Sequence, residues 1–121
     1  MKLKAVIALG LSLVIFSMLL AVPANAMLAR NNSVDCTLDF VGNTAICSCE
    51  ISTDHSNDWI SATMELWKGN TVLNSWSSTG SESITMTQIA NVTRYSTYRL
   101  KIYYTVNGIA QSSVEISRYY G

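Results

Sequence analysis

Hydrophobic and polar residues alternate along most of the chain after residue 33, with the period of two that is typical of strands burying one face. Gly or Asn interrupts this alternation about every ten residues, which is the spacing expected when tight turns connect short strands. No segment after residue 26 keeps an apolar period of 3.6 residues. The pattern predicts an all-β domain of about seven short strands, the number typical of an antiparallel β-sandwich.

The first predicted hairpin turns at Gly42-Asn43, and in it the numbers of paired residues sum to 85. This register makes Cys36 and Cys49 direct neighbours in a non-hydrogen-bonded pair, where side chains approach most closely. We therefore predict a Cys36–Cys49 disulfide and a buried free thiol at Cys47. The residues expected on the core face are Cys36, Leu38, Phe40, Ala45, Cys47, Cys49 and Ile51.

The second predicted hairpin turns at Gly69-Asn70, with paired numbers that sum to 139. Leu66 then meets Leu73 on the buried face. On the other face Trp67 meets Val72, and Trp76 meets Thr63. The residues placed on the outer side of the sheet are therefore Thr63, Trp67, Val72 and Trp76.

Large aromatic side chains on the outside of a small domain commonly mark a binding surface. If the strand at 98–106 lies beside this hairpin, Tyr103 joins the same outer face, with Arg99 and Lys101 around it. The binding residues that we predict are Trp67, Val72, Trp76 and Tyr103. An alternative stays open at this stage, because a register shift of one residue reverses every side chain and places the tryptophans inside.

The segment Tyr98-Arg99-Leu100-Lys101-Ile102 resembles the penultimate strand of immunoglobulin and fibronectin type III domains. By that resemblance Tyr98 or Tyr95 is the corner tyrosine, whose hydroxyl bonds back to the main chain. The strand has no Cys for an intersheet disulfide, so the resemblance is to the sandwich architecture over residues 34–119. The whole layout also resembles that of small secreted bacterial proteins with one immunoglobulin-like domain, a resemblance that implies no catalytic residues.

The N-terminus has the order of a signal peptide. Lys2 and Lys4 precede an apolar run over residues 5–22, and Pro23 and the Ala-x-Ala sequence ending at Ala26 follow it. We expect residues 1–26 to be removed, residues 27–33 to form a short extension and residues 34–121 to form the sandwich. An uncleaved membrane anchor is the competing interpretation, because the run is just long enough to cross a bilayer. We expect a secreted protein with no stable membrane insertion after cleavage.

Charge and residue inventory exclude several function classes. Two of the eight basic residues precede Ala26 and all eight acidic residues follow it, so the mature chain has a formal net charge of −2. It lacks the basic surface that nucleic acids require. With a single His, and without a nucleophile, metal-protease or phosphate-loop motif, we expect neither an enzyme nor a cofactor.

The loop at 54–58 is the one cluster with metal-ligand chemistry. Asp54, His55 and Asp58 offer oxygen and nitrogen atoms, and calcium binding is one interpretation. Asp, Asn and Ser are also ordinary turn residues, and the loop lacks the spacing of an EF-hand, so we expect no metal site.

The sequence thus favours a secreted, non-enzymatic interaction module whose extracellular partner is a glycan, a peptide or a surface protein. The alternative is a structural or self-assembling extracellular protein, in which an exposed strand edge pairs with another copy.

Overall fold

The computed structural model describes residues 32–121, so the predicted signal peptide and most of the predicted extension lie outside the described residues. This part of the chain contains no helix that is long and apolar enough to cross a membrane. Its strands are β1 (Ser33–Val41), β2 (Thr44–Ser52), β3 (Trp59–Lys68), β4 (Thr71–Ser81), β5 (Ser83–Asn91), β6 (Ser96–Val106), β7 (Ile109–Ala110) and β8 (Val114–Tyr120).

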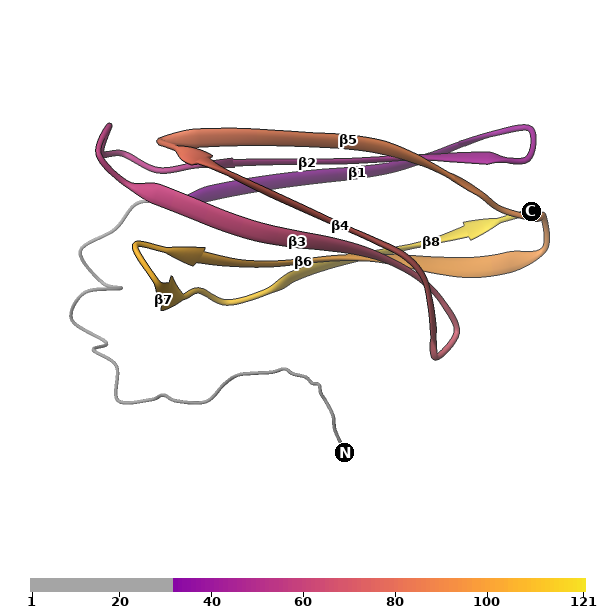
Figure 1. Cartoon of the computed structure of the whole chain (residues 1–121). Helices are drawn as coiled ribbons and strands as arrows, with labels where there is room; N and C mark the ends of the chain where they lie inside the picture. The colour runs from indigo at the N-terminus through magenta and orange to yellow at the C-terminus, as the bar shows by residue number, and fades with distance from the viewer. Residues whose placement is uncertain (1–31) are drawn as a thin grey trace. The chain divides into compact units, whose positions relative to one another are not determined.

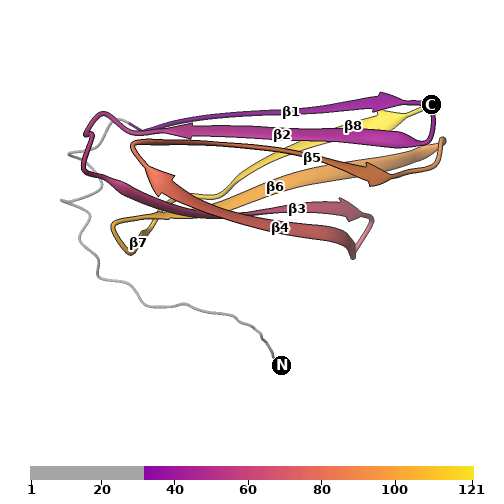
Figure 2. The ribbon, with the colours of Figure 1, turned by 45° about the horizontal axis from the view of Figure 1, so that its top comes forward.

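The strands form two antiparallel sheets that pack face to face (Figure 1; Figure 2). One sheet has the order β1-β2-β5. The other has the order β4-β3-β6, and the free side of β6 pairs with β8 along its first part and with the two-residue β7 at its end. The expected immunoglobulin-like β-sandwich is confirmed.

The core lies between the sheets and follows from strand alternation. Even-numbered residues of β3 and β6 and odd-numbered residues of β2 point inward, and each strand supplies a row of buried hydrophobic side chains. Completely buried side chains include Ile51, Ile60, Met64, Leu66, Tyr98, Leu100, Ile102 and Val106.

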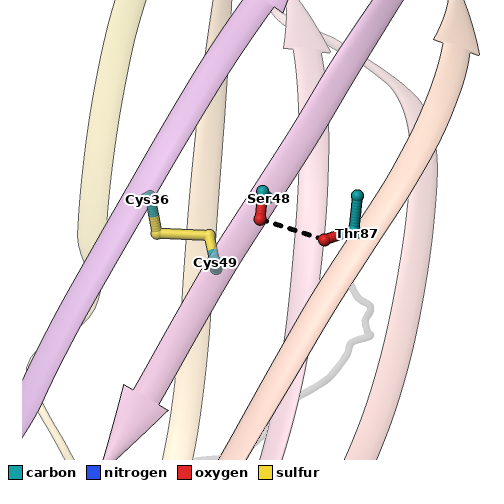
Figure 3. The surroundings of a disulfide bond; sticks show 4 residues. All are labelled: Cys36, Ser48, Cys49 and Thr87. Carbon is teal, nitrogen blue, oxygen red and sulfur yellow. Dashed lines mark hydrogen bonds between the residues drawn. A yellow bond between two sulfur atoms is a disulfide. The ribbon is translucent and has the colours of Figure 1, made fainter.

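The first hairpin has the register that the sequence predicts. Cys36 lies opposite Cys49, Gly42 takes the positive φ of 59° at the turn, and the two cysteines form a disulfide (Figure 3). Their Cα atoms are 4.1 Å apart, in keeping with the close spacing of a non-hydrogen-bonded pair. Cys47 is a free, buried thiol, as expected.

Tyr98 is the corner tyrosine. Its hydroxyl donates to the Thr93 carbonyl at 3.0 Å and accepts from the Thr93 amide at 2.9 Å, while its ring is completely buried. Tyr95 is 76% exposed, so the other candidate for this role is wrong.

The second hairpin departs from the predicted register. Trp67 pairs with Val72 as expected, but a bulge follows, so that Leu66 pairs with Asn74 and Met64 with Trp76. Leu73 is the extra residue and is 38% exposed. The prediction that Trp76 lies on the outer face opposite Thr63 is therefore wrong: Trp76 is half-buried and packs against the core. In the predicted register Leu73 would point inward, whereas with the bulge Trp76 does. Its indole is larger than the Leu73 side chain, so the bulge buries more apolar surface.

The two sheets meet along two edges, which are joined by side-chain contacts on one side and by the chain itself on the other. At one side Arg118 of β8 donates to the Leu38 carbonyl of β1 and pairs with Asp39, both within 2.8 Å. At the other side β4 passes directly into β5 through Glu82, which has a φ of 66°. From this crossing the two strands diverge (Figure 2), and neither has a second strand partner among the described residues.

Candidate binding site

The outer face of the five-stranded sheet carries the aromatic residues that alternation places outside. Odd-numbered residues of β3 lie on this face, and the register with β6 adds the odd-numbered residues of that strand. The rows across the face that matter are Trp59 beside Asn107, Ser61 beside Thr105, Thr63 between Ser77 and Tyr103, Glu65 beside Lys101, and Trp67 between Val72 and Arg99.

Trp67 lies at the charged end of this face. Its Nε1 donates to Glu65 Oε1 at 3.0 Å. The Lys101 Nζ and the Arg99 Cζ lie 4.5 and 5.2 Å from its ring centroid, close enough for cation–π attraction. Both cations also pair with Glu115, at 3.7 and 3.4 Å. The indole is half-buried within a network of opposite charges, so less of its surface is open to a ligand than the sequence implied.

Tyr103 lies in the middle of the face and is 40% exposed. Burial, followed by the charge and the hydrogen bond of Glu65, raises the pKa of Tyr103 to about 12. The phenol is therefore neutral at physiological pH. Glu65 thus acts on two aromatic residues, because it accepts a hydrogen bond from the indole N–H of Trp67 and helps to raise the pKa of Tyr103.

Trp59 lies at the opposite end, directly after the nearly buried Asp58, and was not among the predicted binding residues. It is 50% exposed, and its main chain is held on both sides by Asn107: the Asn107 amide donates to the Trp59 carbonyl, and the Trp59 amide donates to Asn107 Oδ1, each at 2.8 Å. Asn107 has a positive φ of 53° in the turn to β7. The same alternation that puts Trp67 outside puts Trp59 outside, so the sequence held this signal.

Between Trp59 and Tyr103 the face consists mainly of hydroxyl groups. Thr63 and Ser77 hydrogen-bond to each other at 3.0 Å across β3 and β4, and Ser61 and Thr105 lie in the adjacent row. Among the described residues, none of those in these two rows of the face is charged.

The predicted binding residues thus fall into two groups. Trp67, Val72 and Tyr103 lie together on the outer face, and Val72 is 41% exposed. Trp76 does not join them, because the bulge turns it inward.

The 54–58 loop brings its titratable groups together. His55 Nδ1 lies 2.8 Å from Asp54 Oδ1 and 3.8 Å from Asp58 Oδ2, and one ligand atom from each residue falls within 4.8 Å of the others. Asp58 is nearly buried, accepts a hydrogen bond from Asn107 Nδ2 at 2.9 Å, and through its carbonyl accepts from the Glu82 amide. These contacts fasten the loop to two neighbouring turns, which supports the interpretation as turn residues, and we assign no metal site.

Cys47 is unsuited to nucleophilic chemistry. Its side chain is completely buried, and burial raises the pKa of the thiol to about 11. A thiol needs access and a lowered pKa to react.

No protein-family profile and no curated protein sequence matches the chain. Among solved structures it is similar to part of a candidate β-galactosidase from Bacteroides fragilis, with a TM-score of 0.53 and 10% identity over 71% of this chain and 16% of that one. A β-glucuronidase from Bacteroides uniformis gives 0.54 and 10% over 72% and 13%. The sensor domain of an anti-sigma factor from Pseudobacteroides cellulosolvens gives 0.45 and 16% over 74% and 96%.

The chain therefore spans less than a fifth of the two hydrolases that it resembles. At these identities the likeness concerns the fold, a β-sandwich that occurs as one domain of larger proteins, and it carries no activity over to this chain.

Proposed function

We propose that this protein is a secreted, non-enzymatic interaction module that binds an extracellular partner through the outer face of its five-stranded sheet. The observation that carries the proposal is the distribution of aromatic residues. Trp59, Trp67 and Tyr103 all lie on that face, whereas none of the residues on the outer face of the three-stranded sheet is aromatic. Aromatic anchors surrounded by polar groups are typical of binding surfaces.

Two further features support the proposal. The Cys36–Cys49 disulfide suits an oxidising compartment, such as the exterior of the cell. The described residues also bring together no nucleophile and base of the kind that hydrolytic catalysis uses, since Cys47 is buried and the ring of His55 contacts the carboxylates of Asp54 and Asp58 rather than a hydroxyl or a thiol.

A matched pair of variants tests which face binds. Thr63 and Thr87 lie on the outer faces of opposite sheets, and each hydrogen-bonds to a serine across the sheet at 3.0 Å. Thr63→Arg and Thr87→Arg therefore remove the same contact and add the same charge at two places.

The wild type and both variants are applied to arrays of glycans, peptides and surface proteins, with thermal unfolding as the check on folding. We expect Thr63→Arg to lose the interaction and Thr87→Arg to keep it. Retained binding by a folded Thr63→Arg protein, or equal loss in both variants, would overturn the proposal.

One observation favours self-assembly as a second candidate. The neighbouring edge strands β4 and β5 contain no charged residue, although charges on edge strands commonly prevent pairing between copies. Leu73 and Ile89 are exposed beside this edge and line a shallow groove with Asn74 and Asn91. The edge strands of the opposite side, β1 and β8, do carry charges.

A further inference from the structure

We infer that the partner is a neutral polysaccharide, whose chain lies along β3 between Trp59 and Tyr103. The inference rests on the proposed function and names the ligand class and the half of the face that holds it. We call this half the hydroxyl–aromatic patch and define it by Trp59, Ser61, Thr63, Ser77, Tyr103 and Thr105.

The charge distribution separates this patch from the rest of the face. Glu65, Arg99, Lys101 and Glu115 all lie beyond Tyr103, toward the turn at Gly69. Arg99 and Lys101 pair with Glu115, and Glu65 accepts a hydrogen bond from the Trp67 indole. The patch itself contains no ionisable group except the Tyr103 phenol, which is neutral at physiological pH. A charged polymer would gain no ion pair here and would lose part of its hydration, so an uncharged ligand is favoured.

The hydrogen-bonding groups of the patch suit sugar hydroxyls. A Ser or Thr hydroxyl both donates and accepts, as a sugar hydroxyl does, so the two sets of groups can pair in either direction. The main-chain groups of β3 are already paired with β4 on one side and β6 on the other. A peptide strand therefore cannot pair with β3 at this patch, and strand addition to this sheet would have to use the free edge of β4 instead.

The two aromatic rings give the patch its length. Tyr103 lies beside Thr63, four residues along β3 from Trp59, which corresponds to about 13 Å in the strand direction. This distance exceeds the size of one monosaccharide, so a ligand that contacts both rings has several linked sugar units. Asn107 fixes the main chain at Trp59, and the pairing of Thr63 with Tyr103 joins β3 to β6, so the strands that carry the two rings are ordered before binding.

Affinity electrophoresis of the full chain, exported by its expression host, tests this inference. The gels contain hydroxyethyl cellulose or galactomannan as neutral polysaccharides, and polygalacturonate as an acidic one.

Trp59→Ser and Tyr103→Ser each remove one ring from the patch. Tyr119→Ser is the control, because Tyr119 is 60% exposed on β8, outside the patch. Ser61→Arg adds a charge without removing a ring, and thermal unfolding checks that each variant folds.

We expect a neutral polysaccharide to retard the wild type and Tyr119→Ser equally. Trp59→Ser, Tyr103→Ser and Ser61→Arg should each weaken retardation by about tenfold or more. Polygalacturonate should not retard any form.

Unchanged retardation in folded Trp59→Ser and Ser61→Arg proteins would overturn the inference, as would retardation by polygalacturonate alone. If the wild type binds no neutral polysaccharide but binds a peptide or protein that Thr63→Arg releases, this inference is wrong and the proposed function stands. If Thr63→Arg keeps every partner that the wild type binds, both this inference and the proposed function are wrong.

Discussion

The two tryptophans of the second hairpin have different surroundings, and their replacement should have different costs. Trp76 packs against the core, so Trp76→Ser should lower the free energy of unfolding by about 2 to 3 kcal/mol. Trp67→Ser removes an indole that lies in an outer network with Glu65 and Lys101, and should cost about 1 kcal/mol. Urea unfolding of the two single variants measures the difference, and an equal or reversed order would contradict the inward placement of Trp76.

The three cysteines give a thiol count that checks the first hairpin. Cys36 and Cys49 are joined and Cys47 is buried with a raised pKa. A thiol reagent at pH 8 should therefore find no reactive thiol in the folded protein and one after unfolding without reductant. Unfolding with reductant should release the other two. Three thiols in the unreduced, unfolded protein would show that the disulfide is absent.

At the scale of elements, the corner at Tyr98 joins the start of β6 to the segment that precedes it. Tyr98→Phe removes a hydroxyl that serves the amide and the carbonyl of Thr93, and leaves both groups without this partner. We expect a loss of about 1 to 3 kcal/mol in the free energy of unfolding, with the fold unchanged. A stability equal to that of the wild type would mean that the hydrogen bonds of the Tyr98 hydroxyl make no net contribution to the free energy of unfolding. Tyr95→Phe, at an exposed side chain, is the matched control.

The two hairpins differ in how far their registers could be predicted, and the reason is local. In the first, a two-residue turn fixes the pairing, and nothing interrupts alternation from Val41 back to Ser33. In the second, the turn also predicts the first pairs correctly, but the bulge at Leu73 shifts everything beyond it by one residue. Bulges depend on packing between sheets, and the sequence of an uncharged edge strand gives no local sign of one.

The residues of the candidate site also divide into those whose placement could be predicted from strand alternation and those whose placement could not. Trp67 and Tyr103 could be placed on one face because β3 and β6 keep uninterrupted alternation. Trp76 could not, because its position depends on the bulge. The cation–π contacts of Trp67 and the fixing of Trp59 by Asn107 also lay beyond prediction, since they join residues that are distant in the sequence.

At the scale of the whole molecule, the uncharged edge formed by β4 and β5 separates the two candidate functions. If the protein works as a binding module, light scattering should give one mass over a wide range of concentrations. If it assembles through this edge, the mass should rise with concentration, and Ile89→Lys should reverse the rise, because it adds a charge beside the exposed edge. A rising mass that Ile89→Lys leaves unchanged would exclude this edge as the contact.

Export can be tested by intact mass. The small residues ending at Ala26 predict that the secreted protein begins at Met27. Mass spectrometry of material from the medium should therefore give the mass of residues 27–121, reduced by the two hydrogens lost in one disulfide. Protein found only in membranes, or secreted protein that keeps residues before Met27, would contradict the predicted signal peptide.

The three tryptophans allow the most direct test of the claim that the outer face of the five-stranded sheet binds the partner. Trp59 and Trp67 lie on that face and Trp76 points inward, so three indole N–H signals in a nitrogen–proton correlation spectrum report on three places. Titration with the partner retained in the array screen should shift the Trp59 signal most and that of Trp67 less, and should leave that of Trp76 in place. Shifts confined to Trp76, or to main-chain signals of Thr37, Ser48 and Thr87 on the opposite sheet, would contradict the account.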